Sequence, residues 1–317
     1  MSAGHQMRAT SQAEYLAATS RGVPKPELIA EGLWTLPMLM PSGGLRYTLS
    51  AVHLGSTGGV TIVDPGWQVE GGLSFIEQFL AGIGRELRDV RSIVVTHAHP
   101  DHIGMAGALR EASGAQIMMH SKEQHSMKAA AEVSLTDRVA ELQEWGIASA
   151  TIEKMRQHVA DVEDGGGTFL EPDVLLEDGS IVPIDGLRWR VLHTPGHTPG
   201  HICLVDDEQR LLFSGDHLLP TVFPGLGLGA GFEANPIDHY LRSLRALEPF
   251  DDFEVIPGHG YRFHGLRARR LETAEHVLRR AREVAAVIHA EPQVSVWDLA
   301  SRLTWKGGWG MLSLIHI

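Results

Sequence analysis

The chain has 317 residues, of which 43% are hydrophobic and 21% charged, so it can bury one sizeable core. Its formal net charge of -12 opposes binding to nucleic acid and to anionic membrane surfaces, so neither is an expected partner. The single cysteine, Cys203, excludes an intrachain disulfide, and no apolar run approaches the roughly 20 residues that span a bilayer. We therefore expect a soluble cytoplasmic protein.

The first half of the chain alternates short β-branched runs with glycine-rich turns and helical stretches. Residues 1–30 are polar and are predicted to form an N-terminal arm. A buried strand is expected at residues 60–63, and a strand at residues 92–96 leads directly into a histidine-rich loop. Residues 121–163 contain helix formers and few strand signals, which predicts a helical insert. Because this segment is long for a connection, it could act as a lid over a site or merely pack against the core.

The second half repeats the mixture of strands and helices. Two strand-rich halves that each carry helices predict two layers of sheet with helices outside, over residues 31–265. An arginine-rich long helix and a shorter one are then expected within a tail at residues 266–317. The ending Leu312–Ile317 resembles translated sequencing-adapter sequence, so we expect the natural chain to continue differently after about residue 305.

Potential metal ligands follow several of the predicted strands. The loop after residue 96 holds three histidines and an aspartate within six positions, and three further candidate ligands stand after later strands. A single histidine is more often a surface or core residue than a ligand. Imidazole and carboxylate, however, are the groups that divalent transition metals bind, and seven side chains suffice for two ions. The candidates are His97, His99, Asp101, His102, His197, Asp216 and His259.

The ordered motifs HxHxDH, PGHT, SGD and PGHG resemble those of the metallo-β-lactamase superfamily, over about residues 30–265. The resemblance implies an α/β fold, the αββα four-layer sandwich, here with a helical insert and a small C-terminal helical tail. It also implies two divalent metal ions that share one carboxylate. The implied ligands are His97, His99 and His197 for one ion, Asp101, His102 and His259 for the other, and Asp216 as the bridge. Zinc is expected, and iron or manganese can occupy sites of this type.

Further residues are predicted to support the metals or the substrate. Asp64 belongs to the family's first motif and is expected to order the ligands through hydrogen bonds, with Asp101 and Asp216 as the catalytic carboxylates. His193 and His201 flank His197 and either join that outer layer or pack elsewhere. The inferred pocket lining is Leu219, Phe223 and Phe232. Cys203 lies inside a predicted strand and is expected to be an inert buried thiol.

Two residues differ from the motifs of known subgroups of the superfamily and so narrow the range of expected activities. Asp216 stands where true β-lactamases of the family have cysteine or serine, and Leu219 stands where the resembling lactonases have tyrosine. The segment around His197 resembles glyoxalase II enzymes, but the glutathione-binding elements that those enzymes carry beyond the bridging residue and in a larger C-terminal helical domain are not visible in this sequence. The long helix and helical tail resemble the β-lactamase-like protein 2 group, whose winged-helix-like tail would here be truncated.

The leading hypothesis is a dinuclear metal-dependent hydrolase that directs metal-bound hydroxide at a carboxylic ester, thioester or lactone. The alternative is an RNA phosphodiesterase, because the β-lactamase-like protein 2 group includes ribonucleases; the net charge counts against it. A β-lactamase and a non-catalytic nucleic-acid-binding module are less favoured. The tail could also mediate formation of a homodimer.

Overall fold

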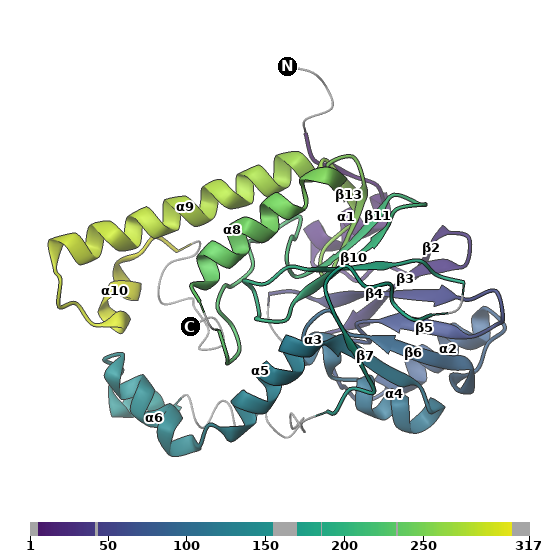
Figure 1. Cartoon of the computed structure of the whole chain (residues 1–317), viewed down its shortest axis with the longest axis horizontal. Coiled ribbons are helices and arrows are strands. Elements are labelled where there is room, and N and C mark those ends of the chain that lie inside the picture. Colours follow the sequence, from purple (N-terminus) through teal and green to yellow (C-terminus); the bar gives the residue numbers. More distant parts are fainter. Residues whose placement is uncertain (1–5, 42–43, 155–169, 185, 233, 306–317) are drawn as a thin grey trace.

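Two β-sheets lie face to face in the computed structural model, and helices cover the outer face of each (Figure 1). The structure describes residues 6–41, 44–154, 170–184, 186–232 and 234–305. The predicted segments 155–163 of the insert and 306–317 of the tail therefore lie outside the described residues. Among the helices that are described, none combines the length and the apolar character needed to cross a bilayer.

The first sheet has seven strands in the order β2-β3-β4-β5-β6-β7-β8. They are β2 (Glu27–Ala30), β3 (Leu33–Leu39), β4 (Tyr47–Leu54), β5 (Val60–Val63), β6 (Val90–Val94), β7 (Gln116–His120) and β8 (Val174–Leu176). β2 to β5 pair antiparallel, whereas β5 to β8 pair parallel. All four residues of β5 are buried, as expected for a strand covered on both faces.

The second sheet has six strands in the order β1-β13-β12-β11-β10-β9. They are β1 (Arg8–Ala9), β9 (Arg190–His193), β10 (Ile202–Asp206), β11 (Leu211–Gly215), β12 (Glu254–Pro257) and β13 (Phe263–His264). β11 and β12 are parallel, and the other neighbours pair antiparallel. Among the parallel neighbours, β6, β11 and β12 are followed by predicted ligands, and β5 is followed by Asp64, which is predicted to order them.

The helices connect and cover the sheets. They are α1 (Gln12–Ser20), α2 (Gly72–Gly82), α3 (Pro100–Ile103), α4 (Ala106–Ser113), α5 (Ser121–Glu132), α6 (Leu135–Glu144), α8 (Pro236–Ala246), α9 (Leu266–Ala290) and α10 (Val296–Arg302), with the short 3-10 helices η2 (Leu87–Asp89) and η3 (Glu248–Phe250). Several start at a side-chain cap: Ser134, Asn235 and Ser295 each accept a hydrogen bond from a backbone N–H of the first turn.

Three apolar clusters hold the four layers together. One packs α2 and α4, including Ile76, on the seven-stranded sheet. A second lies between the sheets around the fully buried Trp189, and a third packs α8 and α9, including Tyr240, on the six-stranded sheet. The order helix, sheet, sheet, helix confirms the predicted αββα sandwich.

The N-terminal segment is built into both sheets. β1 pairs with β13 and β2 pairs with β3, so strand pairing crosses the boundary predicted at residue 30. The buried carboxylate of Glu14 on α1 accepts hydrogen bonds from the backbone N and the Nε of Arg262, at 2.8 and 3.0 Å. Arg262 also pairs with Glu27 and Glu254. The described part of the predicted arm is therefore an integral part of the sandwich.

The insert and the tail meet away from the sheets. α5 and α6 form the described part of the insert, and residues 149–154 are helical as well. The backbone N–H of Trp297, on α10, donates to the carbonyl of Trp145 at 2.9 Å. A Cβ on Gly146 would lie 2.6 Å from the Ser295 side chain, so the two segments touch closely there. α6, α9 and α10 thus form one connected helical wall on this side of the molecule (Figure 1).

Candidate metal centre

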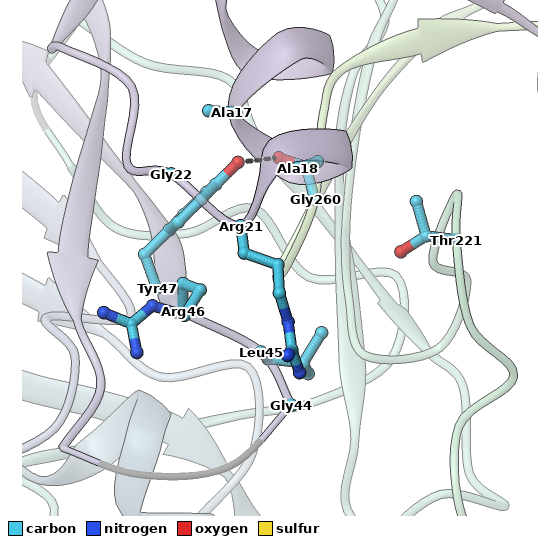
Figure 2. A pocket seen from close by; sticks show the side chains of 10 residues that line it. All are labelled: Ala17, Ala18, Arg21, Gly22, Gly44, Leu45, Arg46, Tyr47, Thr221 and Gly260. Atoms are coloured by element: carbon cyan, nitrogen blue, oxygen red, sulfur yellow. Dashed lines mark hydrogen bonds between the residues drawn. The ribbon is translucent and has the colours of Figure 1, made fainter. Parts of the chain in front are cut away.

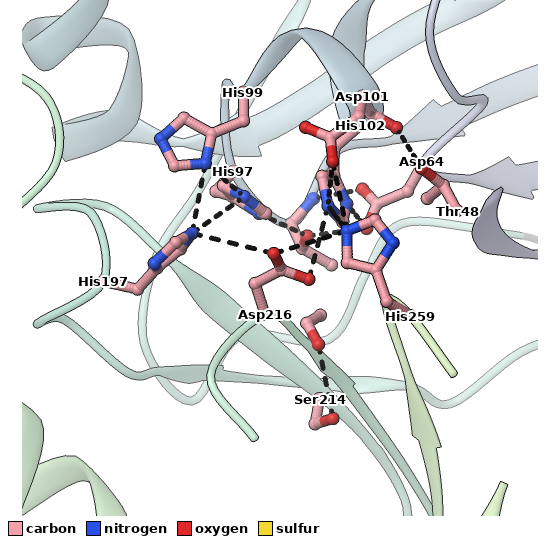
Figure 3. A network of polar contacts seen from close by, with 12 residues as sticks. Thr48, Asp64, His97, His99, Asp101, His102, His197, Ser214, Asp216 and His259 are labelled. Carbon is pink, nitrogen blue, oxygen red and sulfur yellow. Dashed lines mark hydrogen bonds and ion pairs between the residues drawn. The ribbon is translucent and has the colours of Figure 1, made fainter. Parts of the chain in front are cut away.

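All seven predicted ligands come together at one end of the sandwich (Figure 3). Four lie in the loop and helix α3 after β6, and the others follow β9, β11 and β12. Loops at the carboxyl ends of strands are the usual place for a binding site in α/β folds. Backbone hydrogen bonds fix the two sheets to each other here, from Leu49 to Gly258 at 2.7 Å and from Ile202 to Thr96 at 3.0 Å.

The first group of ligands consists of three imidazoles. His97 Nε2 lies 3.0 Å from His99 Nδ1, and His197 Nε2 lies 3.3 and 3.1 Å from those two atoms. His97 and His197 are buried and His99 is half-buried. Three ring nitrogens at such mutual distances surround one point, as the ligands of a single ion do.

The second group contains Asp101, His102 and His259. His259 Nε2 lies 3.1 Å from Asp101 Oδ2 and 3.3 Å from His102 Nε2. Asp216 lies between the groups, with its Oδ2 atom 3.5 Å from His259 Nε2 and 3.9 Å from His197 Nε2 (Figure 3). This position suits a carboxylate that bridges two ions.

Backbone carbonyls set the tautomer of two ligand rings. The Nδ1 atoms of His197 and His259 lie 2.7 Å from the Gly225 carbonyl and 2.8 Å from the Tyr47 carbonyl. Because a carbonyl oxygen only accepts hydrogen bonds, each Nδ1 carries the hydrogen of the neutral ring. The lone pair of each Nε2 is then turned into the centre, where it can bind a cation.

Asp64 sets the tautomer of two further rings. Its carboxylate accepts from the backbone N and the hydroxyl of Thr96, both at 2.7 Å, and from His102 Nδ1 at 2.8 Å. Since the Thr96 hydroxyl gives its hydrogen to Asp64, its oxygen accepts from His97 Nδ1 at 3.1 Å. Both rings therefore also turn the Nε2 lone pair inward. Asp64 has a φ of 50°, a left-handed conformation that costs about 1 kcal/mol and is typical of functional positions.

The two groups differ in electrostatics. Burial and the neighbouring His197 lower the pKa of His99 to about 3. In the second group burial works against ionisation, yet His102 and His259 hold the pKa of Asp101 at about 2. Burial likewise works against protonation of His259, but Asp216 and Asp101 raise its pKa to about 10. The second group therefore attracts positive charge, whether as protons or as a metal ion.

The residues present fit a divalent metal pair. The Oδ1 atom of Asp216 is buried and makes no hydrogen bond, although it lies 3.4 Å from His102 Nε2. A Cβ at Gly258 would come within 2.4 Å of that oxygen, so only glycine leaves the carboxylate its place. A buried anionic oxygen without a hydrogen bond is costly unless a cation satisfies it.

The predicted outer residues lie in different surroundings. His201 is buried, and its Nε2 accepts from the backbone N–H of Asp216 at 3.1 Å, so it contacts a ligand directly. His193 instead stacks on His120, with ring centroids 4.1 Å apart, and its role near the metals stays a prediction. Burial raises the pKa of the Cys203 thiol to about 12, which agrees with the predicted inert thiol.

The predicted pocket residues follow the bridging aspartate. The Leu219 side chain is buried, and its carbonyl accepts from Arg269 Nε, on α9, at 2.6 Å. The Phe223 ring stacks on His276 with centroids 3.8 Å apart and lies 4.4 Å below the Arg269 guanidinium. α9 therefore holds this loop, and the pocket role of Leu219 and Phe223 stays a prediction. Phe232 is half-buried, and its role is likewise untested.

A small cleft opens beside the second ligand group (Figure 2). It lies next to Gly260, which follows His259 and accepts a hydrogen bond from the Tyr47 hydroxyl at 2.6 Å. Its volume of about 40 Å³ matches a few water molecules, so it is too small for a substrate. Its walls are Ala17, Ala18, Arg21, Gly22, Gly44, Leu45, Arg46, Tyr47, Thr221 and Gly260.

Sequence reasoning missed three residues that support the centre. Thr96 directly precedes the histidine-rich loop and links Asp64 to His97. Arg269 was visible only as one member of an arginine cluster. Glu123, in the first turn of α5, gave no signal, because its partners lie 25 to 77 positions away.

Comparison with known proteins identifies the family. The family model described as the metallo-beta-lactamase superfamily matches residues 48–259, well over half of the chain. The chain belongs to the metallo-β-lactamase superfamily. This membership confirms the resemblance seen in the motifs, and it makes the protein a metallo-hydrolase by family.

The chain is similar to two curated proteins and to a solved structure over much of its length. Hydroxyacylglutathione hydrolase GloC of Haemophilus influenzae is 28% identical over 203 residues, which are 63% of this chain and 79% of that protein. A β-lactamase-like protein 2 homologue of Caenorhabditis elegans is 25% identical over 225 residues, 70% of this chain and 60% of the other. The crystal structure of a family protein from Thermus thermophilus aligns with a TM-score of 0.70 at 27% identity, covering 86% of this chain and 93% of that chain.

Proposed function

We propose that this protein is a dinuclear metal-dependent hydrolase of a carboxylic ester, thioester or lactone, with zinc as the expected metal. The observation that carries the proposal is the arrangement around Asp216: four imidazole rings turn lone pairs inward, and the carboxylate lies between two ligand groups. The name of the Haemophilus influenzae relative, a hydroxyacylglutathione hydrolase, denotes a thioester substrate and supports the carbonyl class.

The protein's own residues would organise the reaction. Two divalent ions held here would polarise a scissile carbonyl and lower the pKa of water toward about 7. Asp216 would keep the two ligand groups at a fixed separation. Asp101 and Asp216 would orient the attacking water by accepting its hydrogens and then pass a proton to the leaving group. Asp64 would preserve the ring tautomers throughout the cycle.

The surroundings favour a small-molecule substrate. The net charge of -12 opposes a polyanion such as RNA, and opposes an anionic membrane surface. A cytoplasmic location is part of the proposal, because the fold contains one buried thiol and needs no oxidising compartment. The helical wall of α6, α9 and α10 would shape the substrate's approach.

A substrate panel tests this proposal. The full chain, loaded with Zn²⁺, is assayed for kcat/KM on p-nitrophenyl acetate, a lactone, a glutathione thioester, bis-p-nitrophenyl phosphate, single-stranded RNA and a β-lactam. The proposal predicts that the ester, the lactone or the thioester ranks first, ahead of the β-lactam and the phosphodiesters, and that chelation abolishes its turnover. Preference for the phosphodiesters, or turnover that survives removal of all metal, would contradict it.

A further inference from the structure

Glu123 is a buried carboxylate outside the ligand set. It lies in the first turn of α5, the helix that opens the insert, and its side chain is 2% exposed. A fully buried carboxylate is rare unless its oxygens are paired. Its partners therefore indicate what it is for.

Both oxygens of Glu123 bind the loops that carry the first ligand group. Oε1 accepts from the backbone N–H of Ala98 at 2.7 Å, and Ala98 stands between His97 and His99. Oε2 accepts from the Thr198 hydroxyl at 2.9 Å and from the Gly200 N–H at 2.8 Å, directly after the third ligand of that group. One carboxylate thus joins two loops that lie far apart in the sequence.

The contact suits a side chain with two acceptor oxygens. Three donors converge on the two oxygens of Glu123, and an amide would replace one oxygen by an NH2 group that turns a hydrogen toward at least one of these donors. Burial raises the pKa of Glu123, while the Ala98 and Gly200 N–H groups and the Thr198 hydroxyl act in the opposite direction. The loop also lies directly against the helix, because a Cβ on Gly200 would come within 2.1 Å of the Glu123 backbone nitrogen.

The second ligand group is held in another way. Asp64 binds His102, and the Tyr47 carbonyl binds His259. The Thr48 hydroxyl donates to the carbonyl of Asp101 at 2.6 Å. The hydrogen bonds of Glu123, in contrast, all go to the loops of the first group.

We infer that Glu123 is a positioning residue that selectively supports the metal ion held by His97, His99 and His197. The inference deepens the proposed function and rests on it, since it requires two ions. It also gives the insert a role, because its first helix takes part in the metal centre.

The test is a competition titration of Zn²⁺ against a chromophoric chelator, with the full-length protein. Wild type is expected to bind two ions. Glu123→Gln keeps the size of the side chain but replaces one acceptor by a donor. It is expected to lower the affinity for one Zn²⁺ ion roughly 10–100-fold and to leave the affinity for the other unchanged. Thr198→Val removes a single donor and is expected to shift the same ion in the same direction by less.

Glu14→Gln is the matched control. Glu14 is also a buried carboxylate with three donors to its oxygens, but its partners are Thr35 and Arg262, and neither stands in a loop between two ligands of the first group. This variant is expected to lower the unfolding temperature and to leave both Zn²⁺ affinities unchanged. A Glu123→Gln protein that binds both ions as wild type does, or loses both equally, would overturn the inference. Failure of wild type to bind two ions would instead refute the proposed function.

Discussion

The metal centre and the helical wall beside it are built from different kinds of contact. In the centre, four imidazoles each have a hydrogen bond that fixes the ring; three of the partners, Tyr47, Asp64 and Thr96, lie at or within two residues of a strand end, and the fourth is the Gly225 carbonyl in a loop. In the wall, α6 and α10 meet through a hydrogen bond from the Trp297 N–H to the Trp145 carbonyl. Arg269 on α9 donates to the Leu219 carbonyl in the loop after Asp216. The comparison teaches that hydrogen bonds orient the centre ring by ring, whereas the wall is joined through backbone groups, so a substitution is expected to disturb one without the other.

The largest effect is expected from the bridging carboxylate. Asp216→Asn keeps the shape of the side chain but removes the charge that two ions would share, so kcat/KM should fall by more than the roughly 100-fold upper range that outer residues cost. Metal analysis should show fewer than two ions per chain. A variant that keeps two ions and wild-type turnover would remove Asp216 from the centre.

A smaller loss is expected when the ring tautomers are released. Asp64→Asn disturbs His102 directly and His97 through Thr96, so both Zn²⁺ affinities should fall, each roughly 10–100-fold. This outcome would differ from that of Glu123→Gln, which should affect one ion. The two variants are compared in the same chelator competition, and selective loss in the Asp64 variant would show that the Thr96 link carries no weight.

A substitution in the wall should change KM and leave the metal content unchanged. Arg269→Met removes two hydrogen bonds to the carbonyls of Leu219 and Val222, so the loop should loosen and KM for the best panel substrate should rise about tenfold, or about 1.4 kcal/mol. Arg270→Met is the control, because that arginine pairs with Asp251 instead. Equal KM in the two variants would contradict a role of Arg269 in substrate binding. Loss of metal in the Arg269 variant would show that the wall also supports the metal centre.

The smallest effect concerns stability at the start of the insert. Burial, with the neighbouring His193, lowers the pKa of His120 from 6.5 to about 4. Between these values the unfolded chain takes up a proton that the folded chain does not, so the contribution of His120 to stability is complete above pH 6.5 and falls as the pH drops toward 4. Its Nδ1 also accepts the Lys122 N–H at the start of α5, which protonation would prevent.

His120→Asn preserves the helix cap without titrating. The free energy of unfolding is measured in urea at pH 7 and at pH 5. Between these pH values the wild type should lose about 1 kcal/mol more of it than the variant, after allowance for solvent screening. Parallel losses in the two proteins would mean that His120 does not contribute to the acid sensitivity.

The sequence was sufficient to predict the layers and the convergence of the seven candidate ligands. Each ligand stands in a short motif directly after an apolar strand, so local pattern and strand direction together predict that His97 and Asp216 meet. The predicted N-terminal arm was wrong as a separate segment, because the pairing of β1 with β13 joins residues 8 and 264.

The residues that support the metal centre and the wall, Glu123 and Arg269, could not be predicted from the sequence around them. Glu123 reaches Thr198 across 75 positions, and Arg269 reaches Leu219 across 50. On its own helix each looks like an ordinary charged residue, and only the folded chain shows that each is buried and bound to a loop. The substrate remains a proposal for the same reason, since long-range contacts shape the wall.

Activity measured against the number of Zn²⁺ ions per chain tests the central claim most directly. Metal-free full-length protein is titrated with Zn²⁺, and kcat/KM on the best panel substrate is recorded beside the metal content by native mass spectrometry. The dinuclear account predicts no turnover without metal and a rise that saturates at two ions per chain. Full activity at one ion, or in the metal-free protein, would contradict it.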